Sequence, residues 1–233
     1  MMKRFYKEAK VAAAGDQFGI ELDGKPLRTP EKRALTVPNP ALAEAIAAEW
    51  QGQGITVKPL DLPLTRLVST AIDRVAARRD DVVAEIANYA GTDLLCYRAG
   101  EPRELVERQQ TIWQPLLDWA EARLGATLGV TQSVTPLAQD PAALAAIERA
   151  IAAHDAMRLV ALHLATTTCG SVALGLALLA ERISAEEAFA AAQLEESFQI
   201  ERWGEDAEQT QRRAALKEDI VLAARFAALL RGD

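Results

Sequence analysis

The most restrictive feature of this sequence is the run of residues 159–180, which carries no acidic or basic side chain apart from one histidine. A run of this length can cross a bilayer as a helix. Its middle is polar or small, from His163 through Thr166 to Ser171, and neither end has the aromatic residues and the one-sided Lys or Arg flank that are typical of a spanning helix. A helix that is apolar on all sides is also what the centre of a helical domain requires. The run therefore favours a central helix buried by protein, and we expect no stable membrane insertion.

The charge balance and the cysteines limit the partners and the compartment. The 26 Lys and Arg residues stand against 33 Asp and Glu residues, which gives a net charge of −7 and no excess of cations to release counterions from a nucleic-acid backbone. Cys96 and Cys169 lie in apolar or helical surroundings, and they fit buried thiols in a reducing compartment better than a disulfide or a zinc site. The first residues are basic but lack the apolar run of a secretory signal. We expect a cytoplasmic protein without a nucleic-acid partner.

The first 38 residues are predicted to form a small β-rich domain. Phe18, Ile20 and Leu22 alternate with other residues, which is typical of a strand. Asp23-Gly24 supplies the positive φ angles of a tight hairpin, a return strand starts near Leu27, and residues 33–37 add another short strand. After these residues the pattern changes, because Asn39-Pro40 is a helix start with a capping side chain and a proline in the first turn.

Helical periodicity dominates the rest of the chain. Between residues 64 and 75 six apolar side chains fall at helical spacing on one stripe. Further helices are predicted over residues 80–89, 102–123 with a kink at Pro115, 140–154 and 208–230, and Ser184 with Glu187 forms a capping box at the start of another. We therefore predict an α+β protein with segregated elements, made of a β-rich domain at residues 1–38 and an α-helical domain at residues 39–233.

The sequence offers no convincing catalytic or cofactor motif. Residues 19–25 match the first seven positions of a phosphate-binding loop, but Pro26 stands where a Ser or Thr should reach magnesium, and the glycines flank a hairpin. No Ser or Cys has a base at motif spacing, and no metal-ligand pattern is present. We expect no cofactor, no metal and no catalytic residue.

One carboxylate of the acidic region 181–208 has an unusual predicted position. If residues 189–203 form one helix with about 100° per residue, Glu196 falls inside its apolar arc. Glu195 falls on the polar side, where it can be solvated or paired along the helix. Burying a carboxylate without a partner costs several kcal/mol, so Glu196 needs either an internal structural pair or a partner protein, and the sequence leaves both open. The arc consists of Phe189, Ala192, Ile200 and Trp203.

Four stretches carry a resemblance to a known family. They are KRFY at 3–6 with LDGKPLRTP at 22–30, AEW at 48–50, TDLLCYR at 92–98 with EP at 101–102, and LEESFQIERWG at 194–204. Gln109, Trp113, Pro115 and Trp119 add matching spacing. From residue 3 to about residue 208 the chain resembles the ATP synthase assembly factor 2 family, the assembly chaperones of F-type ATP synthase, in a bacterial version without a transit segment.

The resemblance implies a function and a set of contact residues. Members of this family bind the unassembled α subunit of the catalytic head and shield the surface that later meets the β subunit, without enzymatic activity or a nucleotide requirement. We expect the chain to act as a monomeric protein-binding chaperone. The resemblance assigns the contact with the client to Glu196, Glu195, Gln199 and Trp203. Glu196 is the first candidate because of its unusual predicted position. Trp50 and Asp93 match signature positions too, and for them the sequence favours the alternative roles of packing for Trp50 and helix capping for Asp93 over client contact.

Two other functions are open on the sequence alone. The first is a small-molecule enzyme that uses a carboxylate such as Glu196 as acid or base in a cleft between the β part and the helices. The second is a helical scaffold with a different partner. A raised pKa in a deep pocket would favour the enzyme, and a broad groove would favour the chaperone.

Overall fold

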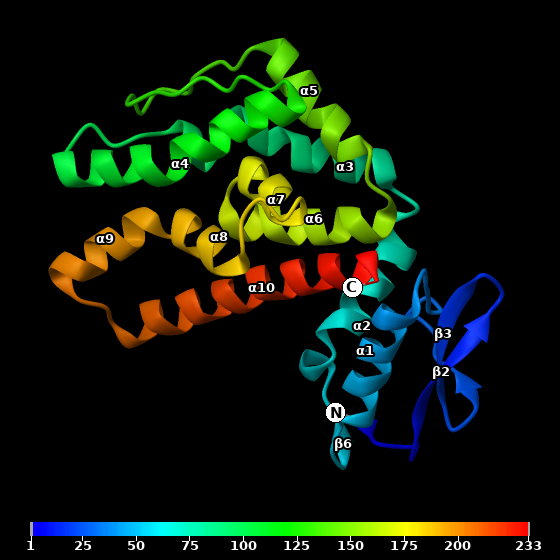
Figure 1. The fold of residues 1–233 in the computed structure, drawn as a ribbon. Coiled ribbons are helices and arrows are strands. Elements are labelled where there is room, and N and C mark those ends of the chain that lie inside the picture. The colour runs from blue at the N-terminus through cyan, green and yellow to red at the C-terminus, as the bar shows by residue number, and fades with distance from the viewer. Residues whose placement is uncertain (1, 233) are drawn as a thin grey trace. The chain divides into compact units, whose positions relative to one another are not determined.

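The computed structural model describes residues 2–232 and divides into two compact units (Figure 1). The first unit comprises the chain up to Arg79, residues 155–161 and the residues from Arg225. The second comprises residues 80–154 and 162–224. Short strands at the N-terminal end are followed by helices, so the predicted α+β fold, with a small N-terminal β part and a larger helical part, is confirmed.

The sheet of the first unit is built on two hairpins. Strand β2 (Ala9–Ala14) pairs antiparallel with β3 (Gln17–Leu22), and β3 pairs with the short strands β4 (Lys25–Pro26) and β5 (Thr36–Val37). Asp23 and Gly24 have φ angles of 49° and 77°, as the predicted tight turn requires. The return strand β4 lies directly after the turn and before the predicted start near Leu27, whose amide still donates to the Ile20 carbonyl at 2.7 Å. A separate ladder joins β1 (Met2–Lys3) to β6 (Thr56–Val57).

Helix α1 (Pro40–Gln51) packs against β2 and β3. It begins where the sequence predicts, since the Asn39 side chain accepts a hydrogen bond from the Leu42 amide at 3.0 Å and Pro40 occupies the first turn. The domain boundary that the sequence predicts after residue 38 lies inside the first unit, which continues to Arg79. The 3₁₀ turn η1 (Pro59–Asp61), α2 (Pro63–Thr70) and the π-helical segment η2 (Ala71–Val75) follow.

The second unit is helical around one core. Its helices are α3 (Arg79–Asn88), α4 (Arg103–Leu124), α5 (Pro141–Ala152), α6 (Ala156–Cys169), α7 (Val172–Leu179), α8 (Ala185–Ala192), α9 (Leu194–Trp203) and α10 (Ala207–Arg231), with 3₁₀ turns η3 (Tyr89–Thr92) and η4 (Leu94–Cys96). Three of these helices, α3, α6 and α10, also contribute residues to the first unit. Helix α4 contacts α5, α7 and α9. The core residues include Cys96, Trp113, Leu117, Leu174 and Phe198.

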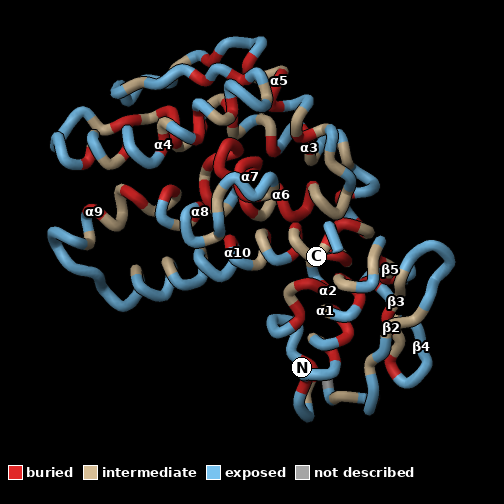
Figure 2. The backbone as a smooth tube through the Cα atoms, in the orientation of Figure 1, coloured by how far each residue is buried: buried red, intermediate tan, exposed pale blue. Residues whose placement is uncertain are grey.

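The long uncharged run is buried, as predicted, but it is two helices instead of one. Helix α6 ends at Cys169, Gly170 has a φ of 65°, and the Ser171 side chain caps α7 by accepting from the Leu174 amide at 3.0 Å. Figure 2 shows α7 buried along its length. It approaches α6 closely at Gly175, where a Cβ would lie 2.5 Å from the Thr166 hydroxyl. Among residues 2–232, no helix is both long and apolar enough to cross a membrane.

Candidate functional site

Helix α9 holds most of the residues that the sequence singled out, and it is separate from α8. Gln193 has φ −110° and ψ 23°, outside the helical region, so α8 ends at Ala192 and α9 begins at Leu194. Angles counted from Phe189 therefore do not carry over to α9. Leu194 and Phe198, four residues apart, are its buried residues and set its inner side. The predicted apolar arc of one continuous helix is wrong for this reason.

Glu195 is the carboxylate of α9 that faces the protein interior. Gln109 of α4 is 1% exposed and donates a hydrogen bond from Nε2 to Oε1 of Glu195 at 2.6 Å. Burial raises the pKa of Glu195 above its ordinary value, and the hydrogen bond from Gln109 opposes that rise. The prediction that Glu195 is solvated or paired along its own helix is wrong, since its hydrogen-bond partner is Gln109 of α4 and Arg202 donates instead to Glu104 at 3.1 Å.

Glu196 is half-buried and has an internal partner. One of its carboxylate oxygens accepts a hydrogen bond from the side-chain amide of Gln209 on α10. The partner is a neutral amide instead of a cation, so the negative charge of Glu196 is not neutralised. Within residues 2–232 its other oxygen makes no hydrogen bond. That oxygen keeps its capacity to accept from another molecule.

The guanidinium groups of two arginines lie over the ring of Phe198, which is on the same helix as Glu195 and Glu196. The guanidinium carbons of Arg108 and Arg202 lie 5.2 Å and 4.2 Å from the ring centroid. Arg108 also contacts Glu104 at 2.9 Å and Glu201 at 2.8 Å, and its hydrogen bonds hold the pKa of both carboxyls below the usual range. Exposed pairs of this kind add little stability. Their effect is to fix the positions of charged groups along α4 and α9.

Gln199 and Trp203 lie on the outer side of α9. Both are exposed, and the Trp203 side chain, in the last turn before Gly204, is 77% exposed. Tryptophan is enriched among the few residues that dominate the binding energy of protein interfaces. We call Glu195, Glu196, Gln199 and Trp203 the α9 surface. It joins one interior-facing carboxylate, one carboxylate with free acceptor capacity and one bare indole, with no group arranged as a nucleophile.

Comparison with known proteins assigns the chain to a family. The model of the family described as "ATP12 chaperone protein" matches residues 3–121, just over half of the chain. This chain belongs to the ATP12 chaperone family. The family member Protein atp12, mitochondrial, of Schizosaccharomyces pombe is 27% identical over 214 residues, which cover 87% of this chain and 74% of that protein.

Solved structures related to this ATP12-family chain share its whole fold. The crystal structure of Atp12 from Paracoccus denitrificans is 41% identical and superimposes with a TM-score of 0.95, covering 99% of each chain. The Atu1473 protein of Agrobacterium tumefaciens, described as a putative chaperone, is 42% identical with a TM-score of 0.91 and covers 97% of this chain and 85% of that one. The resemblance to an assembly-chaperone family, predicted from the sequence, is confirmed.

Asp93 and Trp50 have structural roles in the ATP12 fold. Asp93 is 0% exposed and accepts from the Leu95 amide at 3.0 Å, the Ser171 hydroxyl at 2.7 Å and the Ala173 amide at 3.1 Å. It therefore caps η4 and the start of α7 together, while burial raises its pKa. Trp50 is 8% exposed, and its indole nitrogen donates to the Thr65 hydroxyl at 3.1 Å. The capping and packing interpretations are confirmed.

Sequence reasoning missed the two glutamines that hold the carboxylates of this ATP12-family protein. Gln109 binds Glu195 and Gln209 binds Glu196, both from other helices. One signal for Gln109 was available, because it precedes Trp113 by four residues and so shares its helix face. A glutamine on the face of a buried tryptophan is buried with it and needs hydrogen-bond partners. Gln209 carried no comparable signal, since nothing in the sequence places α10 against α9.

Proposed function

We propose that this chain is an ATP-independent assembly chaperone that binds the unassembled α subunit of the catalytic head of F-type ATP synthase. The observation that carries the proposal is membership of the ATP12 chaperone family together with an α9 surface that presents binding groups and no catalytic arrangement. The proposed complex is one-to-one, with a monomeric chaperone. We further propose that it acts in the cytoplasm, in keeping with two free, buried cysteines.

A chaperone of this kind has a simple physical task. An unassembled subunit exposes a large apolar interface that aggregates until its proper neighbour covers it. A shield must bind strongly enough to cover that interface yet more weakly than the final neighbour, so that assembly displaces it without an energy source. The bare indole of Trp203 supplies apolar contact area, and Glu196 supplies a directional acceptor, which together suit a reversible interface.

No observation favours the enzyme alternative. That alternative requires Glu196 to act as a general acid or base in a cleft. Glu196 lines neither the cavity of about 470 Å³ beside Arg98 nor the cavity of about 590 Å³ beside Trp50. A general acid or base must reach its substrate within hydrogen-bond distance, and neither of these two cavities brings a substrate to Glu196.

The proposal is tested by protecting the client from aggregation. Purified α subunit is heated or diluted from denaturant with and without this protein, and light scattering is followed in the absence of nucleotide. We expect suppression that is complete near a one-to-one ratio. Unchanged scattering at a several-fold excess of this protein would refute the proposed function.

A pair of variants locates the contact. Trp203→Ser should weaken binding to the α subunit about 30-fold, the equivalent of roughly 2 kcal/mol for an interface hot spot. Leu60→Ser is the matched control, because Leu60 is 81% exposed in the first unit and does not belong to the α9 surface. Equal effects of the two substitutions would remove Trp203 from the contact.

A further inference from the structure

Arg98 is a buried cation with one nitrogen left without a partner. The residue is 9% exposed and follows η4. Its Nε donates to the Leu95 carbonyl at 2.6 Å and its Nη1 to the Gln109 carbonyl at 3.1 Å, while the guanidinium lies 5.3 Å from the centroid of the Trp113 ring. Its Nη2 is buried and makes no hydrogen bond within residues 2–232.

The charge of Arg98 is also uncompensated. No carboxylate of the described residues forms an ion pair with it, and both of its hydrogen bonds go to neutral carbonyls. Burial lowers the pKa of Arg98 from its ordinary value, but a guanidinium stays charged in proteins. An unpaired charge and an unsatisfied donor in the interior are both costly, which makes this site ready for an anion.

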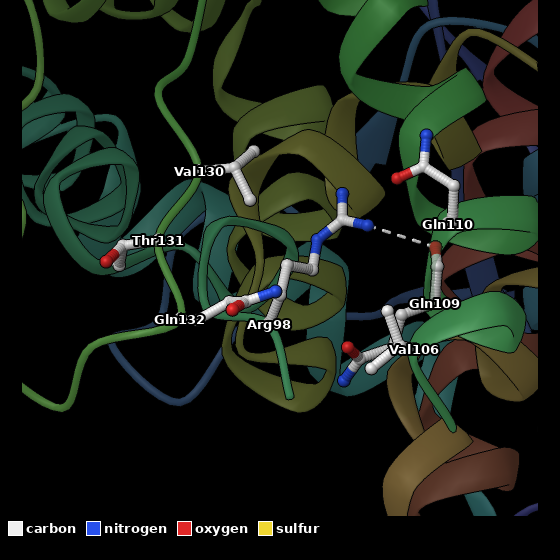
Figure 3. A pocket seen from close by; sticks show the side chains of 7 residues that line it. All are labelled: Arg98, Val106, Gln109, Gln110, Val130, Thr131 and Gln132. Carbon is white, nitrogen blue, oxygen red and sulfur yellow. Dashed lines mark hydrogen bonds between the residues drawn. The ribbon is translucent and has the colours of Figure 1, made fainter. Parts of the chain in front are cut away.

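A cavity of about 470 Å³ adjoins this guanidinium. Figure 3 shows Arg98 between two walls, with Val106, Gln109 and Gln110 of α4 on one side and residues 130–132 on the other. The second wall is held in place, since the Arg98 amide donates to the Thr131 carbonyl and the Thr131 amide donates to the Cys96 carbonyl, both at 2.8 Å. In the same view one guanidinium nitrogen is bonded to Gln109, and the other terminal nitrogen points away from it.

We propose that the Arg98 cavity binds a carboxylate group, with Nη2 as its principal donor. Among residues 2–232, Arg98 is the only charged residue that lines the cavity, so the site offers one positive charge, which matches a monoanion. A phosphate would call for several cations or a helix N-terminus. Two other polar lining groups are the side-chain amides of Gln110 and Gln132, which suit the peptide groups next to an acidic side chain.

The cavity is linked to the α9 surface through one residue, Gln109. Its side chain accepts from the Ala99 amide at 2.8 Å and donates to Glu195 at 2.6 Å, and its main-chain carbonyl accepts from Arg98 at 3.1 Å. A ligand that engages Arg98 therefore meets the residue that positions Glu195. We assign the carboxylate to an acidic side chain of the client, and this assignment of the source rests on the proposed function. The existence of the site does not.

Access to Nη2 requires movement at the mouth of the cavity. Gln110 and Gln132 line the cavity and are exposed, and exposed side chains change rotamer in picoseconds to nanoseconds. Their displacement is therefore no barrier to a ligand. A negative charge introduced at Gln110 would occupy the cavity from within.

The test uses small capped amino acids and the intact protein. N-acetyl-aspartate methylamide is titrated into ¹⁵N-labelled protein at constant ionic strength, and the Nε–Hε signal of Arg98 is followed by NMR. That signal is assigned by its loss in Arg98→Lys. We expect a saturating shift with a Kd of roughly 1–10 mM, as suits a small ligand. The neutral probe N-acetyl-asparagine methylamide should give no saturating shift.

Two glutamine variants separate the site from a general charge effect. Gln110→Glu places a carboxylate in the cavity and should weaken the capped aspartate at least tenfold. Gln211→Glu adds the same charge at an exposed position of α10 that does not line the cavity, and should leave binding unchanged. No saturating shift, an equal response to both probes, or equal behaviour of the two variants would overturn the proposal.

Binding to the α subunit then identifies the source of the carboxylate. If Gln110→Glu binds the α subunit more weakly than Gln211→Glu does, the carboxylate in the cavity comes from the client. Unchanged client binding, with the capped aspartate still bound by the wild type, supports the site and assigns it to a free small carboxylate. A wild-type protein that binds capped aspartate and ignores the α subunit refutes the proposed function while the site stands.

Discussion

Charge reversal at Glu196 tests whether this carboxylate serves a partner or the fold. In the structure Glu196 makes one hydrogen bond, from the Gln209 amide, and is half-exposed to water. A lysine at this position can still bond to Gln209 once the amide rotates to offer its oxygen. The internal loss is therefore limited to about 1–2 kcal/mol, which lies between the net value of an ordinary hydrogen bond and that of a bond to a charged group. This corresponds to a fall in Tm of no more than about 8 °C for a chain of this size.

The effect on the client should be larger than the effect on the fold. Removing one partner of a charge contact in an interface costs about 2–5 kcal/mol, so Glu196→Lys should raise the Kd for the α subunit at least about 30-fold. Titration calorimetry measures the affinity, and thermal unfolding measures the stability of the same sample. Glu148→Lys is the control, because Glu148 is exposed on α5 and its reversal changes the net charge equally.

Two results would refute this reasoning. If Glu196→Lys bound the α subunit as well as Glu148→Lys did, Glu196 would not be a contact. If its Tm fell by much more than about 8 °C, the bond to Gln209 would be a structural anchor, and any loss of affinity would follow from unfolding.

Three further predictions concern stability. Trp50→Ala should lower the free energy of unfolding by about 3–5 kcal/mol and Trp50→Phe by less, because only the first empties the buried ring position; equal urea midpoints for both would contradict this. Because burial holds the pKa of Glu195 above its unfolded value of 4.5, this group favours the fold below that pH and loses that contribution as the pH rises through its folded pKa. Glu195→Gln can keep the bond to Gln109, so its urea midpoint relative to wild type should increase from pH 4 to pH 7, and a constant difference would refute the cause given for the shift. Burial raises the pKa of Cys96 and of Cys169 to about 12, so neither thiol should react with iodoacetamide at pH 8 until urea unfolds the protein, and rapid labelling of the folded chain would show that they are accessible.

Elements whose signals lie within a few residues were predictable. The Asp23-Gly24 turn has its positive φ angles, and Asn39 caps α1. The capping box at α8 is formed, with the Ser184 amide donating to Glu187 at 2.7 Å and the Glu187 amide donating to the Ser184 hydroxyl at 3.1 Å. In each case the donor and acceptor are neighbours in sequence, so the residue types alone specify the geometry.

Helix continuity was not predictable in the same way. Residues 159–180 contain no proline, and the local signals for a break, the left-handed Gly170 and the Ser171 cap, are reinforced by Asp93, 78 residues before Ser171, which accepts from the Ser171 hydroxyl and the Ala173 amide. The break at Gln193 separates α8 from α9 without a proline or glycine at that position. Periodicity predicts a helix from its apolar spacing, but that spacing by itself does not show where one helix stops and the next begins.

The sequence by itself determined the family, the α+β class and the existence of an acidic helical region that contains Trp203. Only the tertiary structure decided which carboxylate of that helix turns inward, because the choice depends on Gln109, 86 residues away from Glu195. It also decided that Arg98 is buried with a free nitrogen beside a cavity. The physical reason is that burial and desolvation are properties of the packed chain, and a charged residue acquires them only when other segments close around it.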